Sequence, residues 1–218
     1  MADNVAVYGI RWAKGYNGGT DYPQPVECFV ASGAPFDVNG GAQNVALGIG
    51  DPVTRIADGS VTLCAGSEGG SGGVALYGIV VGVAPYYDSV QGVMRPTAAL
   101  PDNVVYGTNL ERQSKVFVIP VVGSVFEIDC DDAVTATTEA AYQALVGTNC
   151  DHVLSGVASV DTRAKPKLDI SSTGTATAQW RIVGLSKSLD NQDFSGANVK
   201  LLVVANETQD PVTGATGI

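Results

Sequence analysis

The chain has 218 residues, and its 22 Asp and Glu residues outnumber 12 Lys and Arg residues, giving a formal net charge of -10. Non-specific nucleic-acid binding depends on Lys and Arg to neutralise phosphates, so the composition argues against direct binding to DNA or RNA. Charged residues make up 16% of the chain, below the usual value of about 25%. The 27 Gly and 10 Pro suit many turns between short strands, and the length suits one large β-domain or two small ones.

Residues 1–44 predict an N-terminal arm that packs on the core. A short strand is expected from Val5 to Ile10, before a tight turn at Tyr16-Asn17-Gly18-Gly19, where the Asn-Gly pair readily supplies positive φ angles. A second strand is expected from Val26 to Ala31. Residues 32–44 are rich in Gly, Pro and Asn and predict a loop.

A β-rich core domain is expected over residues 45–205. Its first half contains apolar runs that predict strands at residues 45–49, 61–65 and 74–83, the last with bends or bulges at Gly78 and Gly82. The Gly- and Ser-rich run 68–73 predicts a flexible loop, since it lacks the lysine and the following helix of a phosphate-binding loop. Residues 85–114 predict a long excursion with little regular structure, which is a candidate contact loop.

The segment from Lys115 to Cys130, KVFVIPVVGSVFEIDC, predicts a central hairpin that turns at Val122-Gly123-Ser124. Val116 to Val122 is almost wholly apolar, as in a strand covered on both faces. From Val125 to Cys130, apolar and acidic residues alternate, which predicts a strand with one face mostly in water.

One helix is expected from Thr138 to Val146, with Thr137 as its N-cap and Gly147 just past its end. Further strands are expected at residues 150–154, 167–170, 178–186 and 199–205. Residues 206–218 are polar and predict a flexible C-terminal arm, which is either disordered or becomes ordered on a partner. These elements together predict an all-β fold, mainly an antiparallel β-barrel or sandwich, with one short helix.

The four cysteines, Cys28, Cys64, Cys130 and Cys150, form no CxxC pair and have no zinc-finger spacing. They predict buried free thiols. The N-terminus lacks the basic start and long apolar run of a signal peptide, and no apolar window has the length of a transmembrane helix. We therefore expect synthesis in a reducing cytoplasm and no membrane contact.

The acidic residues Glu127, Asp129, Asp131 and Asp132 are the strongest local candidates for a metal site. Ca²⁺ takes about six to eight oxygen ligands, and its loops have a DxDxDG spacing that is missing here. Exposed acids are far more often solvated than metal-bound, so a solvated strand end is the interpretation that we favour. No metal or other cofactor is expected.

His152 is the only histidine, so the chain cannot by itself form a metal site that needs two or three histidines. Cys150, Asp151 and His152 are adjacent, but neighbouring side chains of a strand point to opposite faces, which argues against a catalytic triad. Trp12, Trp180 and the tyrosines are more typical of a core or subunit interface than of a sugar platform. No catalytic, cofactor-binding or metal residues are predicted.

Several short motifs follow one another along residues 45–205. They are Gly50-Asp51-Pro52-Val53, a turn at Asp58-Gly59, the run Gly-Ile-Val-Val-Gly-Val at 78–83, Val116-Phe117-Val118, Val125-Phe126-Glu127-Ile128, and Ile182-Val183-Gly184-Leu185 followed by Asp190-Asn191. Their order resembles a group of virion structural proteins from tailed bacteriophages, particularly short-tailed ones, that are often encoded beside the major capsid protein.

The resemblance implies a capsid decoration (cement) protein without enzymatic residues, which binds the major capsid protein on the outside of the head. It also implies a homo-oligomer, with a trimer favoured, on the exterior of a virion assembled in the host cytoplasm. The alternatives are a tail or head–tail connector subunit and a glycan-binding module or hydrolase on the virion. The last of these needs an exposed aromatic platform or a cleft with paired carboxylates.

Overall fold

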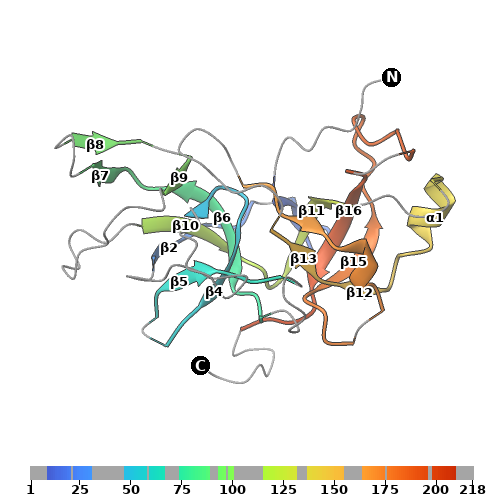
Figure 1. The fold of residues 1–218 in the computed structure, drawn as a ribbon, viewed down its shortest axis with the longest axis horizontal. Coiled ribbons are helices and arrows are strands. Elements are labelled where there is room, and N and C mark those ends of the chain that lie inside the picture. The colour runs from blue at the N-terminus through green and yellow to red at the C-terminus, as the bar shows by residue number, and fades with distance from the viewer. Residues whose placement is uncertain are drawn as a thin grey trace.

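The computed structural model describes residues 9–20, 22–30, 47–57, 59–66, 74–88, 93–96, 98–100, 115–131, 137–154, 164–174, 176–195 and 198–209. Expectations for residues 5–8, 32–44, 68–73 and 210–218 lie outside these ranges. The described strands are mostly antiparallel and form two five-stranded sheets, accompanied by one short helix (Figure 1). The predicted all-β class is confirmed, and no closed barrel is found in the described ranges.

The first sheet contains the C-terminal strands of the chain. Its order is β1 (Arg11–Gly15), β11 (Ser124–Asp129), β16 (Lys200–Ala205), β15 (Trp180–Leu185) and β12 (Asn149–Cys150). The register between β1 and β11 shifts between Trp12 and Lys14, which leaves Ala13 as the extra residue of a β-bulge.

The second sheet curls strongly. Its order is β2 (Val26–Phe29), β10 (Lys115–Pro120), β6 (Gly78–Val83), β4 (Pro52–Arg55) and β5 (Val61–Leu63). Val30, just after β2, forms an isolated bridge with Val61 of β5, so the two edges of this sheet approach each other. A bulge in β6 leaves Val81 unpaired, beside the expected bend at Gly82.

Three two-stranded pairs complete the strands of the described residues: β3 (Leu47–Gly48) with β9 (Ala99–Leu100), β7 (Tyr86–Asp88) with β8 (Val93–Arg95), and β13 (His152–Val153) with β14 (Lys167–Leu168). A 3₁₀ turn, η2 (Ile170–Ser172), follows β14. The prediction of little regular structure between residues 85 and 114 is wrong for the described part, because β7, β8 and β9 lie there. The β7–β8 hairpin projects at the opposite end of the molecule from α1 (Figure 1).

The helix α1 (Glu139–Gln143) is shorter than expected. Its N-cap is Thr138 rather than Thr137, because Thr138 has extended backbone angles and its side chain accepts the N–H of Ala141. Gly147 has φ 95°, and its N–H leaves the helix to donate to the carbonyl of Ile182 at 2.8 Å. The chain is therefore turned toward β15 before a longer helix can form.

The expected central hairpin is wrong, because β10 and β11 are consecutive in sequence but belong to different sheets. β10 pairs with β2 and β6, whereas β11 pairs with β1 and β16. Between them the chain turns at Val121 to Gly123, with a positive φ of 72° at Gly123. The segment 115–129 therefore supplies the second strand of both sheets and joins the sheets covalently.

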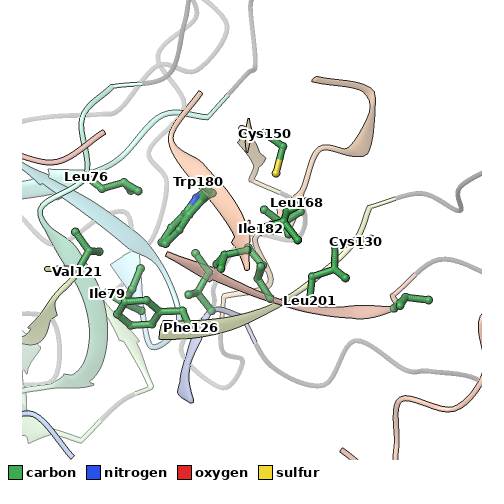
Figure 2. Packing of buried hydrophobic residues seen from close by; sticks show 14 of the residues in the cluster. Leu76, Ile79, Val121, Phe126, Cys130, Cys150, Leu168, Trp180, Ile182 and Leu201 are labelled. Atoms are coloured by element: carbon green, nitrogen blue, oxygen red, sulfur yellow. The ribbon is translucent and has the colours of Figure 1, made fainter. Parts of the chain in front are cut away.

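The larger hydrophobic core lies where the two sheets meet (Figure 2). Ile79 of β6 and Val121 after β10 contribute from the second sheet, and Phe126 and Trp180 contribute from the first. The Phe126 and Trp180 rings meet edge to face, with centroids 6.0 Å apart. A smaller core fills the curl of the second sheet and consists of Cys28, Val30, Leu47, Val53, Val61, Leu63, Val80, Val116 and Val118.

The chain beyond β16 crosses from the first sheet to the second. The N–H of Leu76 donates to the carbonyl of Glu207, and the N–H of Gln209 donates to the carbonyl of Leu76, both at 2.9 Å. The expectation of a flexible arm is therefore wrong for residues 206–209, which are docked by backbone hydrogen bonds.

Candidate functional site

A pocket of about 430 Å³ opens where β1 of the first sheet meets β6 of the second. Ligand pockets commonly have volumes of about 300–1,000 Å³. The lining residues are Gly9, Ile10, Arg11, Trp12, Tyr22, Ile49, Gly50, Val80 and Val81. We call this cavity the β1–β6 pocket.

Two aromatic rings form an aromatic corner in the pocket. The Trp12 and Tyr22 ring centroids are 5.2 Å apart, and their planes meet at 71°. Tyr22 is 55% exposed, whereas the Trp12 indole Nε1 is buried and has no hydrogen-bond partner in the described structure. The turn after β1, closed by a 2.8 Å bond from Gly15 N–H to the Gly19 carbonyl, returns the chain so that the two rings meet.

Backbone contacts fix the walls of the pocket. The N–H of Ile10 donates to the carbonyl of Gly50 at 3.2 Å, and the N–H of Gly50 donates to the carbonyl of Val80 at 2.8 Å. The bulges at Ala13 and Val81 both adjoin the pocket, and β-bulges often occur beside functional sites, where they redirect side chains. Sequence reasoning missed this site; only the turn at residues 16–19 hinted at the aromatic pair.

The acidic residues on β11 are not a solvated strand end. Glu127 is 7% and Asp129 5% exposed, because β11 lies between β1 and β16 and both of its faces are covered. Glu127 forms an ion pair with Arg11 and accepts a 2.5 Å hydrogen bond from the hydroxyl of Ser186. These contacts hold Glu127 between the edge strand β1 and the end of β15.

The other acidic residues of this group each have contacts of their own. Asp129 lies opposite the buried Lys200, whose Nζ forms an ion pair with Asp190 at 2.9 Å. Burial raises the pKa of Asp129 to about 6, and the charge of Lys200 opposes that rise. Asp131 accepts the N–H of Ile170 at 3.0 Å. Asp132 lies outside the described residues, within which no group of three metal-ligating side chains forms.

His152 belongs to a buried hydrogen-bond network. Its Nε2 lies 3.1 Å from the carbonyl of Cys64, and the indole N–H of Trp180 donates to its Nδ1 at 3.3 Å. These partners fit a neutral imidazole protonated on Nε2. Burial lowers the pKa of His152 to about 4.

Gln179 extends this network to the second sheet. Its Nε2 donates to the carbonyls of Ala65 and Val74, at 2.8 and 2.7 Å, and so joins the chain after β5 to the chain before β6. Because Gln179 immediately precedes β15, the network holds the two sheets together. Both ring nitrogens of His152 and the Nε2 of Gln179 are engaged in these structural hydrogen bonds, whereas the Oε1 of Gln179 is buried without a hydrogen-bond partner in the described structure.

All four cysteines are buried free thiols, as predicted. Burial raises the pKa of Cys150 to about 12, with the neighbouring Asp151 adding to the effect, and burial also raises the pKa of Cys130 well above its ordinary value. Thiols with raised pKa values contain little of the nucleophilic thiolate, so these two cysteines behave as apolar core residues.

A second surface feature lies on the edge strand β2 and its neighbour β10 in the second sheet. Phe29 of β2 and Phe117 of β10 are 36% and 37% exposed on one face. Between them, Lys115 lies 2.8 Å from Glu27 and places its Nζ 5.2 Å from the centre of the Phe29 ring. We call these four residues the β2–β10 patch.

Comparisons of the chain with protein-family models, curated proteins and solved structures find no match. No described helix is both long and apolar enough to cross a membrane. The β1–β6 pocket and the β2–β10 patch are therefore the features from which function is inferred.

Proposed function

We propose that this protein is a non-enzymatic structural protein of a tailed-bacteriophage virion, and that it decorates and stabilises the outside of the head. Its partners are the major capsid protein and further copies of itself, with a trimer as the favoured oligomer. It is made in the host cytoplasm and becomes part of the capsid exterior.

The observation that carries this proposal is the β2–β10 patch. β2 is the edge strand of its sheet and meets the opposite edge strand β5 only beyond its own end, at Val30, and edge strands that expose apolar side chains are prone to pair with other chains. Phe29 and Phe117 provide aromatic contact area of the kind enriched in interface cores. Glu27 and Lys115 add one charge of each sign, so the patch can form complementary contacts with a neighbouring subunit.

Two further properties of the protein fit a rigid subunit that attaches to the outside of a capsid. The two sheets are joined by the short β10–β11 turn and by the network around Gln179, which restrains their relative movement. The net charge of -10 also complements a basic partner surface and favours fast encounter with it.

The proposal is tested by cryo-electron microscopy of virions from the host in which the protein is made. We expect density for this chain as knobs on the head lattice, and that density would define the oligomer. Density at the tail alone would instead support the connector or tail-subunit alternative, and absence from the particle would overturn both.

A capsid-binding assay tests the role of the β2–β10 patch directly. The double variant Phe29→Ser with Phe117→Ser is added to capsids that lack the protein, beside Val183→Ser, which alters a 37% exposed side chain on the other sheet. We expect at least a tenfold loss of binding for the double variant alone, with urea denaturation confirming that both proteins are folded. Equal binding by the two variants would contradict the role of the patch.

A further inference from the structure

A binding function separate from shell attachment follows from the β1–β6 pocket. We propose that this pocket binds an uncharged oligosaccharide through the aromatic corner of Trp12 and Tyr22. The proposal does not rest on the β2–β10 patch, which is formed by other residues.

The aromatic corner offers the surface that a sugar ring needs. The C–H groups of a pyranose carry partial positive charge and pack on the negative face of an aromatic ring, while the hydroxyls at its edge remain free for hydrogen bonds. The two rings pack edge to face on each other, so a sugar would stack on the ring face that this contact leaves uncovered. Tyr22 is exposed enough for a ligand to reach it without unfolding of the core.

The polar groups of the pocket favour a neutral ligand over an anionic one. Arg11 is the charged residue in the described lining, and its guanidinium already forms an ion pair with Glu127. The net charge of -10 further disfavours the approach of an anion.

The pocket is also held in shape before a ligand arrives. The bonds from Ile10 to Gly50 and from Gly50 to Val80 connect its walls through the backbone. Preformed walls reduce the entropy that binding would otherwise cost, so a small pocket with two aromatic contacts is able to hold a weakly interacting sugar.

Tryptophan fluorescence of the full chain provides a direct readout. The chain has two tryptophans, and Trp180 is fully buried in the core, so ligand in the pocket should perturb the emission of Trp12. The probes are neutral malto-, cello-, manno- and galacto-oligosaccharides, with a sialylated and a sulfated oligosaccharide for comparison. Calorimetric titration of each hit gives the affinity independently of fluorescence.

We expect at least one neutral series to bind saturably and more tightly than the anionic probes. Tyr22→Ala should weaken binding at least tenfold, whereas Tyr22→Phe should stay within about threefold of wild type because the ring remains. Tyr16→Ala removes a 63% exposed tyrosine outside the pocket and should leave affinity unchanged. Trp12→Phe should abolish the fluorescence response.

Three results would overturn the proposal: no response to any neutral probe, a preference for the anionic probes, or equal effects of Tyr22→Ala and Tyr16→Ala. Capsid attachment is scored separately. Tyr22→Ala should still decorate capsids, and the Phe29 and Phe117 double variant should still bind sugar, so the failure of one proposal is distinguishable from the failure of the other.

Discussion

The side-chain amide of Gln209 hydrogen-bonds to both backbone groups of Arg55. Its Oε1 accepts the Arg55 N–H at 2.6 Å, and its Nε2 donates to the Arg55 carbonyl at 3.0 Å. In the described structure, β6 pairs with β4 only at Pro52 and Val53. The amide thus takes the place of a further strand residue beside β4.

Replacing this amide should weaken the junction between the two sheets. Gln209→Ala removes two hydrogen bonds and should lower the free energy of unfolding by about 1–3 kcal/mol, as measured by urea denaturation. Gln24→Ala changes an exposed glutamine and serves as the matched control. If Gln209→Ala loses no more unfolding free energy than the control, the contact between Gln209 and Arg55 contributes nothing to stability.

The buried His152 should make the fold sensitive to acid. Its pKa is about 4 in the folded protein and about 6.5 when unfolded, so between these values the unfolded chain binds a proton that the folded chain does not. The contribution of the neutral His152 to the free energy of unfolding is therefore present above pH 6.5. It is lost as the pH falls toward 4, by about 3 kcal/mol in total. In His152→Gln, which retains a donor and an acceptor, this loss should disappear.

Urea denaturation of both proteins from pH 7 to pH 4 tests this. The stability advantage of wild type over His152→Gln should shrink by about 3 kcal/mol across the range. Other acidic groups titrate in both proteins and cancel in the comparison. Parallel stability curves would contradict the assignment of a neutral buried imidazole.

Asp51 should have the opposite pH dependence. Its carboxyl is buried and accepts the N–H of Gly48 at 2.8 Å, and burial raises its pKa to about 7, with the Gly48 hydrogen bond opposing the rise. The folded chain therefore keeps a proton that the unfolded chain loses between about pH 4 and pH 7, so stability falls as pH rises through this window.

Asp51→Asn removes this dependence and keeps an oxygen that can accept the Gly48 N–H. Its stability relative to wild type should rise by about 4 kcal/mol between pH 4 and pH 8. Glu139→Gln removes one negative charge from an exposed position and controls for the change in net charge. If Asp51→Asn is no more stable than wild type at pH 8, the site does not disfavour the ionised carboxylate of Asp51.

Gly78 should not tolerate any side chain. A Cβ there would lie 2.2 Å from Cγ1 of Val118 and 2.6 Å from the carbonyl oxygen of Ile119. Gly78→Ala should therefore cost about 1–3 kcal/mol or more by overpacking, as measured by thermal or urea unfolding. At Gly184 of β15 the nearest atom would be 3.7 Å away, so Gly184→Ala is the strand control and should be nearly neutral.

The fold class was predictable because short apolar runs alternate with Gly, Pro and Asn along the chain. The assignment of strands to sheets was not, and β10 and β11 show why. A short turn between two apolar strands is compatible with a hairpin and equally with a crossing between sheets. The burial of Glu127 depends on Arg11, 116 residues away, and on Ser186, so local alternation could not indicate it.

The pocket and the patch were less accessible to sequence reasoning. Tyr22 meets Trp12 only because the turn after β1 reverses the chain, and the bulges at Ala13 and Val81 depend on pairing with distant strands. Phe117 resembles a core residue in its apolar run, yet its side chain lies on an exposed face of the second sheet. The spacing of apolar residues shows which positions are apolar. It does not show which other part of the chain, if any, covers those side chains.

The position of β10 and β11 as the second strand of each sheet has a consequence for folding order. The turn between them is local and can form early, but the partners on either side come from both ends of the chain, from β1 and β2 to β16. Closing such long loops costs chain entropy before the contacts repay it. The chain should consequently fold slowly, since the first sheet is complete only after β1 and β16, from opposite ends of the chain, have both reached β11.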